Sequence, residues 1–332
     1  MKSLIVSSPG NIEFADIPKP EIGPYQALVK VDVCGICNST DAKLIEGTMF
    51  WAPPFPIVLG HESVGRVVAI GAKVTRYKVG DRVVRPIYRA PDPSSPLKPA
   101  NGGFVEYGYV TDPFAMAADG DGSMLGDYNA QRQVVAPEGL SAVEAALCIS
   151  LSETASLLDP LPNLAGKTVL VAGTGVAGLS FGLWAKFAGA KVIALGRRAS
   201  RLHVAAKLGA DVVIDTTEPD YLAQILAVNG PVDVMLEATG VVALADSLQP
   251  ILKPGGAALA YGVPPTGDKY AGFWQNPPVD EHLRYAWVAD LVLRGWVKPE
   301  WFVTHTWEFN DALAAFDQTR AGHVFKGFVE IG

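Results

Sequence analysis

The sequence predicts an α/β protein in which a doubly wound parallel sheet accompanies a second, β-rich domain. Its 332 residues are about twice the length of a typical single domain. The first half holds short alternating apolar runs that glycine and proline separate, whereas from residue 167 apolar runs alternate with helical stretches. Strands that alternate with helices are typical of a parallel sheet covered by helices.

The first half is expected to form mostly strands. Residues 27–33 alternate in polarity and are rich in β-branched side chains, as in a half-buried strand. Residues 64–70 and 81–84 show the same pattern. We expect loops at 91–99, which holds four prolines, and at 112–128, which is rich in Gly, Ala and Asp.

The second half is expected to alternate between the two kinds of element. The predicted strands are 168–172, 191–195, 212–215, 232–237 and 257–261. The predicted helices between them are 178–188, 200–208 and 221–227. After about residue 296, a helix at 310–320 and a strand at 325–331 are expected to return to the first domain.

Composition argues against nucleic acid and membranes as partners. Lys and Arg number 27 against 34 Asp and Glu, a net charge of −7, which disfavours binding to polyanions. The uncharged stretch 169–185 contains four glycines and is shorter than the roughly 20 apolar residues of a membrane span. Three cysteines and no signal-peptide pattern lead us to expect a cytoplasmic protein.

A glycine-rich turn follows the strand predicted at 168–172. Residues 173–178 read G-x-G-x-x-G. In such a turn the glycines permit a tight bend, close approach to a pyrophosphate and close helix packing, and the helix N-terminus faces the phosphates. The predicted dinucleotide contacts are Gly173, Gly175, Val176, Ala177 and Gly178.

The next strand indicates which dinucleotide binds. Proteins that select NAD place an acidic residue near its end, but here Gly196, Arg197 and Arg198 follow the strand. Two guanidinium groups would bind a 2′-phosphate through charge-assisted hydrogen bonds. We therefore predict NADP(H), the alternative being two solvated arginines on a surface turn.

Cys37, His61 and Glu62 offer a thiolate, an imidazole and a carboxylate. This set suits a zinc ion that keeps an open position for catalysis, and Asp41 would accept a hydrogen bond from the far nitrogen of His61. The alternatives are a core histidine and, because Cys34 and Cys37 form C-x-x-C, a redox pair. Zinc with a hydride carrier indicates alcohol–carbonyl oxidoreduction.

These motifs resemble those of the zinc-dependent medium-chain dehydrogenase/reductase superfamily, the alcohol and polyol dehydrogenases. The matching segments are 34–41, 60–71, 79–84, 102–107, 137–147, 173–178, 237–240 and 253–256. The resemblance implies a GroES-like β-barrel catalytic domain and a Rossmann domain, with the active site in the cleft between them. We expect the catalytic domain at 1–155, the NADP-binding Rossmann domain at 156–290, and a C-terminal return to the catalytic domain at 291–332.

The resemblance also implies one catalytic zinc. Cys37 and His61 would be ligands, and Glu62 would bind the ion or exchange with water. The remaining protein ligand would be Glu153, with Cys148 as the alternative. The family's structural zinc lobe is absent, because residues 85–102 contain no cysteine.

A proton relay is the next implied feature. Thr40 would hydrogen-bond the substrate oxygen and pass on its proton, with Ser39 as the fallback. Three residues rather than the family's usual two separate Cys37 from Asp41. Lys43 stands where many relatives have a histidine that finishes the proton path, so the path would end differently or through water.

Four further residues carry implied roles. Thr239 and Val263 would lie near the nicotinamide, and Thr154 is a further expected cofactor contact. Lys326 falls where the family has a basic residue close to the glutamate of the zinc site.

The predicted function is zinc-dependent, NADP(H)-dependent interconversion of an alcohol, such as a polyol, sugar or cyclitol, and its carbonyl. The alternatives are a zinc-free quinone or enone reductase of the same superfamily and a non-catalytic NADPH-binding protein. Phe50, Trp51 and the aromatic insert 270–274 would line a substrate pocket or form core or subunit contacts. A homodimer or homotetramer is expected, and the apolar run 256–263 would suit edge-to-edge sheet pairing.

Overall fold

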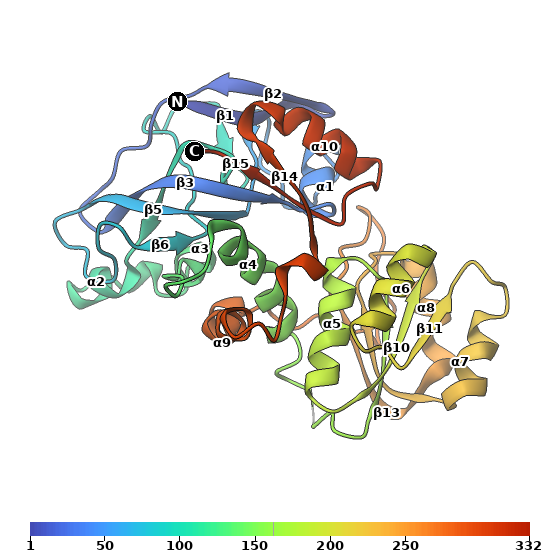
Figure 1. Ribbon diagram of the computed structural model, residues 1–332. Coiled ribbons are helices and arrows are strands. Elements are labelled where there is room, and N and C mark those ends of the chain that lie inside the picture. The colour runs from blue at the N-terminus through green and yellow to red at the C-terminus, as the bar shows by residue number, and fades with distance from the viewer. Residues whose placement is uncertain (162) are drawn as a thin grey trace. The chain divides into compact units, whose positions relative to one another are not determined.

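The computed structural model describes residues 1–161 and 163–332, which form two compact units (Figure 1). Unit 1 comprises Met1–Ser152 and His282–Gly332, and unit 2 comprises Glu153–Glu281. The chain thus builds most of unit 1, then all of unit 2, and finally returns to unit 1. Among the described residues, no helix is long and apolar enough to cross a membrane.

Unit 1 consists mainly of strands. They are β1 Lys2–Ser8, β2 Asn11–Asp16, β3 Gln26–Ile36, β4 Ile57–Val58, β5 Glu62–Ile70, β6 Arg82–Val84, β7 Lys98–Pro99, β8 Tyr107–Thr111, β14 Val303–Glu308 and β15 Lys326–Glu330. One sheet has the order β14-β15-β3-β5-β6, with β8 also paired to β3, and the other has the order β2-β1-β4-β7. The strands predicted at 27–33, 64–70, 81–84 and 325–331 are confirmed. The sequence did not predict β2, because its mostly exposed residues form no apolar run.

The helices of this unit are mostly short. They are α1 Thr40–Glu46, α2 Pro113–Ala118, α3 Tyr128–Arg132, α9 Glu281–Leu293 and α10 Ala312–Arg320, with α4 Ala142–Ser156 running from unit 1 into unit 2. The loop expected at 112–128 contains α2, because the Asp112 side chain accepts a hydrogen bond from the Ala115 N–H and caps a helix there. The sequence did not predict α4, whose buried residues 145–152 show no polar face.

Unit 2 contains one parallel sheet. Its strands are β9 Thr168–Ala172, β10 Lys191–Gly196, β11 Val212–Asp215, β12 Val232–Glu237 and β13 Leu252–Ala260, and its helices are α5 Val176–Phe187, α6 Ala199–Lys207, α7 Tyr221–Asn229 and α8 Val242–Ser247. The strand order is β11-β10-β9-β12-β13 and every pair is parallel. The doubly wound sheet is thereby confirmed. The order reverses beside β9, where ligands bind at the carboxyl ends of the strands in such sheets.

The outer edge of β13 is partly occupied by the chain's own backbone. The Gln275 N–H donates to the Ala258 carbonyl and the Ala260 N–H donates to the Gln275 carbonyl, both at 2.8 Å. The sequence suggested the apolar run 256–263 for pairing with a second copy. The Ala258 carbonyl and the Ala260 N–H of this run already form hydrogen bonds within the chain.

Candidate functional site

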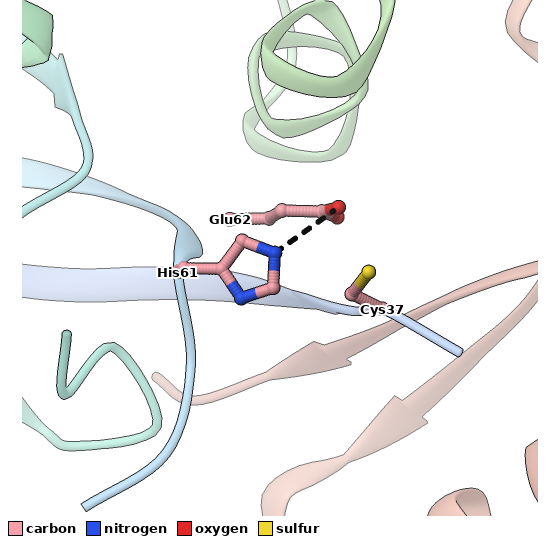
Figure 2. A group of neighbouring side chains, drawn as sticks. All are labelled: Cys37, His61 and Glu62. Atoms are coloured by element: carbon pink, nitrogen blue, oxygen red, sulfur yellow. Dashed lines mark ion pairs between the residues drawn. The ribbon is translucent and has the colours of Figure 1, made fainter. Parts of the chain in front are cut away.

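Two neighbouring strands of unit 1 bring the three expected metal ligands together. Cys37 directly follows β3, His61 directly precedes β5, and Glu62 is the first residue of β5. In the antiparallel register of these strands Gly35 lies opposite Glu62. One ligand atom from each of the three side chains lies within 4.8 Å of the others (Figure 2).

Two glycines make room for this group. A side-chain carbon on Gly35 would collide with Oε2 of Glu62. Gly60 has a φ of +101°, and a side-chain carbon there would lie 2.7 Å from the Phe104 nitrogen and 2.9 Å from Sγ of Cys34. Both positions therefore require glycine, because the strand ends pack too tightly for any side chain.

Asp41 holds both the imidazole and the loop that carries the thiol. Its Oδ1 lies 3.4 Å from Nδ1 of His61, and its Oδ2 accepts a 2.8 Å hydrogen bond from the Cys37 N–H. The carboxylate is fully buried. Nε2 of His61 lies 3.9 Å from Oε1 of Glu62, so the second ring nitrogen faces the expected ligands (Figure 2).

Glu62 is held from two sides by residues distant in sequence. Lys326, at the start of β15, forms a buried ion pair with Oε2 and also donates to the Ile36 carbonyl at 3.2 Å. The Ser150 hydroxyl, on α4, donates to Oε1 at 2.9 Å. Burial would raise the pKa of Glu62, but the positive charges of Lys326 and His61 outweigh it and leave that pKa below its usual value.

The charges of this group also shift the pKa values of His61 and Cys37. Burial works against the charge of His61, yet the Asp41 carboxylate and the Cys37 sulfur beside it hold its pKa well above the usual value. Burial raises the pKa of Cys37, but the hydrogen bond and charge of His61 bring it below the usual thiol value. In the metal-free protein the thiolate thus already has a favourable environment, and the thiolate is the form that binds metal.

The donor set fits zinc on the chemistry of its atoms. Sulfur, imidazole nitrogen and carboxylate oxygen are the ligands of catalytic zinc sites, with bond lengths of about 2.0–2.3 Å, and the three candidate atoms lie within 4.8 Å of one another. Asp41 supplies the outer carboxylate that commonly orients a zinc-binding histidine.

The two candidates for a remaining ligand have different surroundings. Glu153 belongs to unit 2, where its Oε2 accepts a 2.7 Å hydrogen bond from the Tyr261 hydroxyl. Cys148 is fully buried, and burial raises the pKa of its thiol to about 12. Sequence reasoning missed Ser150, which contacts Glu62. The only signal was a polar residue one helical turn before Glu153.

The expected relay residues lie at the start of α1. The Thr40 N–H points at Sγ of Cys37 at 3.5 Å. The Lys43 ammonium donates to the Ser39 hydroxyl at 2.9 Å. Burial lowers the pKa of Lys43. Thr40 is thus the hydroxyl residue adjacent to the Cys37 sulfur, whereas Ser39 is exposed and hydrogen-bonded to Lys43.

The glycine turn in unit 2 depends on backbone packing. Gly173 has a φ of +115°, and a side-chain carbon there would lie 2.9 Å from Cγ2 of Thr239. A side-chain carbon on Gly178 would collide with the Gly173 carbonyl. Gly175 caps α5 without any side-chain hydrogen bond, and the first turn of α5 has no acidic residue. The N–H groups at this helix end therefore suit a phosphate.

Basic residues follow β10. Arg197 and Arg198 are exposed, and Arg198 is the N-cap of α6 with no side-chain cap bond. Sequence reasoning missed Arg201, which is partly buried. Burial and the nearby charge of Arg198 lower the pKa of Arg201.

The other expected cofactor contacts have distinct environments. The Thr154 hydroxyl is hydrogen-bonded with that of Ser180 at 2.9 Å and accepts from Nε1 of Trp184 at 3.0 Å, so it joins two elements within unit 2. Thr239 abuts the glycine turn, as described above. The Val263 carbonyl lies against Gly240, where a side-chain carbon would be 2.5 Å from it.

Comparison with known families matches both units. Residues 23–118 match the alcohol dehydrogenase GroES-like domain. Residues 177–283 match the zinc-binding dehydrogenase family.

Individual relatives agree with these matches. An L-threonine 3-dehydrogenase of Rhizobium etli is 31% identical over 284 residues, covering 80% of this chain and 78% of the relative. Sorbitol dehydrogenase of Gallus gallus is 29% identical over 345 residues, covering 98% and 94%. A Sinorhizobium meliloti protein described as a zinc-binding dehydrogenase, solved with NADP bound, aligns with a TM-score of 0.77 at 26% identity, over 99% of each chain. The chain therefore belongs to the zinc-type medium-chain dehydrogenase superfamily, with its GroES-like and Rossmann folds, and is an oxidoreductase of the alcohol dehydrogenase type.

Proposed function

We propose that this protein is a zinc-dependent, NADP(H)-dependent dehydrogenase that interconverts a small alcohol, of the polyol kind, with its carbonyl compound. The observation that carries the proposal is the group of Cys37, His61 and Glu62, whose ligand atoms lie within 4.8 Å of one another. A domain with only a structural role would have little reason to place a thiol, an imidazole and a carboxylate together beside the buried Asp41.

In the proposed site Cys37, His61 and Glu62 hold the zinc ion. When bound, zinc supplies Lewis-acid chemistry that polarises the substrate oxygen. Asp41 keeps the imidazole oriented, while Lys326 and Ser150 hold the Glu62 carboxylate in place. We keep Glu153 as the proposed further ligand.

Proton movement falls to the start of α1. The Thr40 hydroxyl would exchange a proton with the substrate oxygen, since its backbone lies against the ligand sulfur. Ser39 and Lys43 form a hydrogen-bonded pair one residue away, and this pair would carry the proton toward solvent. Such positioned acid–base groups contribute about 10²–10⁴-fold to the rate.

The cofactor would bind along the glycine turn, with nicotinamide chemistry supplying the hydride. Gly173, Gly175 and Gly178 let its pyrophosphate approach the N-terminus of α5. Arg197 and Arg198, in place of an acidic residue, support NADP(H) over NAD(H), as does the NADP bound to the Sinorhizobium meliloti relative. Thr239 and Val263 would flank the nicotinamide.

The substrate class rests on the relatives. Sorbitol dehydrogenase and L-threonine 3-dehydrogenase are named for substrates that are small and hydroxylated. We therefore propose a small polar substrate with a secondary hydroxyl group, screened as polyols, hydroxy amino acids and the matching ketones.

Elemental analysis with dinucleotide titration tests the proposal. About one zinc per chain, with tighter binding of NADPH than of NADH, is expected. Dinucleotide binding without any zinc after metal supplementation would favour the zinc-free reductase. Failure to bind either NADPH or NADH would reject both the proposed zinc-dependent dehydrogenase and the zinc-free reductase.

Cofactor choice is tested separately with the double variant Arg197→Ala/Arg198→Ala. We expect the preference for NADPH over NADH to fall about tenfold or more, because charge-assisted bonds to the 2′-phosphate are lost. An unchanged preference would reject the arginine assignment. Lys207→Ala, which removes one positive charge at the far end of α6, serves as a control for the loss of positive charge in this region.

A further inference from the structure

Glu237 is a fully buried carboxylate at the carboxyl end of β12. Its Oε1 accepts hydrogen bonds from the Thr239 hydroxyl, the Thr239 N–H and, at 3.0 Å, the Gly240 N–H. The side chain thereby closes the Thr239–Gly240 turn on itself. This use of a buried charge is costly unless every oxygen is satisfied.

The other oxygen reaches a distant residue. The Tyr270 hydroxyl donates toward Oε2 of Glu237 and also lies 2.6 Å from the Gly262 carbonyl. The ring of Tyr270 packs against the unit 2 core and lies 6.1 Å from that of Trp274. The ring of Tyr270 is thus packed in the core of unit 2, and its hydroxyl links the end of the exposed stretch 265–269 to the last residue of β12 through a hydrogen bond.

The two turns that this contact joins touch backbone to backbone. A side-chain carbon on Gly262 would collide with the Gly240 nitrogen and would lie 2.5 Å from Oε2 of Glu237. A side-chain carbon on Gly240 would likewise lie 2.5 Å from the Val263 carbonyl oxygen. The backbones of the two turns are therefore packed directly against each other. Thr239, on the same turn, abuts Gly173 of the dinucleotide turn. All these residues follow carboxyl ends of β9, β12 and β13, the ligand-binding edge of such a sheet.

We propose that Tyr270, acting through Glu237, is a positioning residue that fixes Thr239 and Val263 where the nicotinamide ring binds. The inference rests on the proposed function and assigns a role within its cofactor site. Tyr270 itself touches neither cofactor nor substrate in this proposal. Its effect is expected to be largest at the nicotinamide end, since its own contacts are with the turns after β12 and β13.

The test is Tyr270→Phe, which removes only the hydroxyl. The Kd of NADPH, followed by nicotinamide fluorescence, is expected to rise about tenfold, as for loss of a hydrogen bond to a charged group. The Kd of 2′,5′-ADP, which lacks the nicotinamide, is expected to stay within about twofold. A general loosening of unit 2 would weaken both ligands, so the difference between them isolates positioning.

Tyr221→Phe is the matched control. Its hydroxyl is also partly buried and bonded to a side chain, Ser247, at 2.7 Å, but it lies outside the proposed site. Glu237→Gln is a second variant expected to weaken NADPH more than 2′,5′-ADP. Thermal unfolding of each variant shows that it folds.

The two proposals fail in different ways. If wild-type protein binds NADPH and Tyr270→Phe binds it equally well, the positioning role is rejected while the proposed function stands. Equal weakening of NADPH and 2′,5′-ADP also rejects it. If wild-type protein binds neither NADPH nor NADH, the proposed function is rejected and the inference with it. Should wild type prefer NADH, the same comparison uses NADH and ADP-ribose.

Discussion

The candidate metal group is formed by side chains, whereas the dinucleotide turn is formed by backbone. The metal group consists of ionisable and polar side chains that lie in or next to β3, β5, α4 and β15, and all of them except the partly buried Cys37 are buried. The dinucleotide turn consists of backbone, and its requirements are spaces that only glycine leaves open. The metal group depends on the chemistry of its side chains, whereas the dinucleotide turn depends on the absence of side chains at its glycines.

This difference determines how each site should respond to mutation. A charged group whose partner is removed remains buried without compensation, which is costly. A glycine replaced by alanine adds one carbon, and the cost depends on the atoms that the carbon meets. The metal group should therefore respond to changes of chemistry, and the turn to changes of volume.

Cys37→Ser should have the largest effect. We expect zinc content to fall below about a tenth of an ion per chain and kcat/KM to drop on the order of 10³-fold, since metal polarisation is worth several kcal/mol. Cys148→Ser, at a buried thiol outside the group, should keep its zinc. Metal analysis and kinetics on the same preparations decide, and a fully active Cys37→Ser protein would remove the metal site.

Lys326→Met should destabilise the metal-free protein by about 3 kcal/mol, because it leaves the Glu62 carboxylate buried without its cation. Lys253→Met, which removes an exposed partner of Asp233 at 3.0 Å, should cost less than about 1 kcal/mol. Urea unfolding of both variants measures the difference. Equal costs would mean that the buried pair adds nothing.

The same ion pair predicts a pH dependence. Because the folded protein holds the pKa of Glu62 below its ordinary value of 4.5, the pair stabilises the metal-free fold above pH 4.5. That stability is lost as pH falls through the lower, folded-state pKa. Lys326→Met should lose this contribution, so its stability should fall less steeply with acidification. A variant that parallels wild type below pH 4.5 would contradict the assignment.

Thr40→Ala should lower kcat by about 10²-fold with zinc retained, as expected for loss of a relay hydroxyl. Ser39→Ala, one residue away and exposed, should lower kcat less. Steady-state kinetics at several pH values measures both. The reverse order of effects would move the relay to Ser39.

Gly178→Ala should cost about 1–3 kcal/mol and weaken dinucleotide binding, because its new carbon would meet the Gly173 carbonyl. Gly182→Ala is matched to it within α5. There the nearest atom would be Cγ1 of Val192 at 3.6 Å, an ordinary contact, so the variant should be neutral or up to about 1 kcal/mol more stable. Similar results at both positions would mean that volume does not govern the turn.

Local patterns in the sequence predicted the dinucleotide turn well. The strand at 168–172 was predicted with the bounds that the structure gives it, and the G-x-G-x-x-G spacing located Gly173 and Gly178. This succeeds because the motif, the strand and the helix are consecutive, and because Gly178 packs against Gly173, only five residues before it.

The metal group was predicted only in part. The grouping of Cys37, His61 and Glu62 followed from residue types, and Lys326 from family resemblance. Ser150 was missed, because its contact with Glu62 spans 88 residues and nothing in the spacing reveals it. Tyr270 was visible as part of an aromatic insert, but its bond to Glu237 depends on the path of the loop, which no local pattern specifies.

The placement of Lys326 has a consequence for synthesis. Its strand, β15, pairs with β3, yet it leaves the ribosome only after all of Glu153–Glu281 has been made. At about 5–20 residues per second, Glu62 waits some ten seconds or more for its counter-ion. The Glu62 carboxylate therefore stays without this lysine until unit 2 has been synthesised, and the pairing of β3 with β15 is completed only after that.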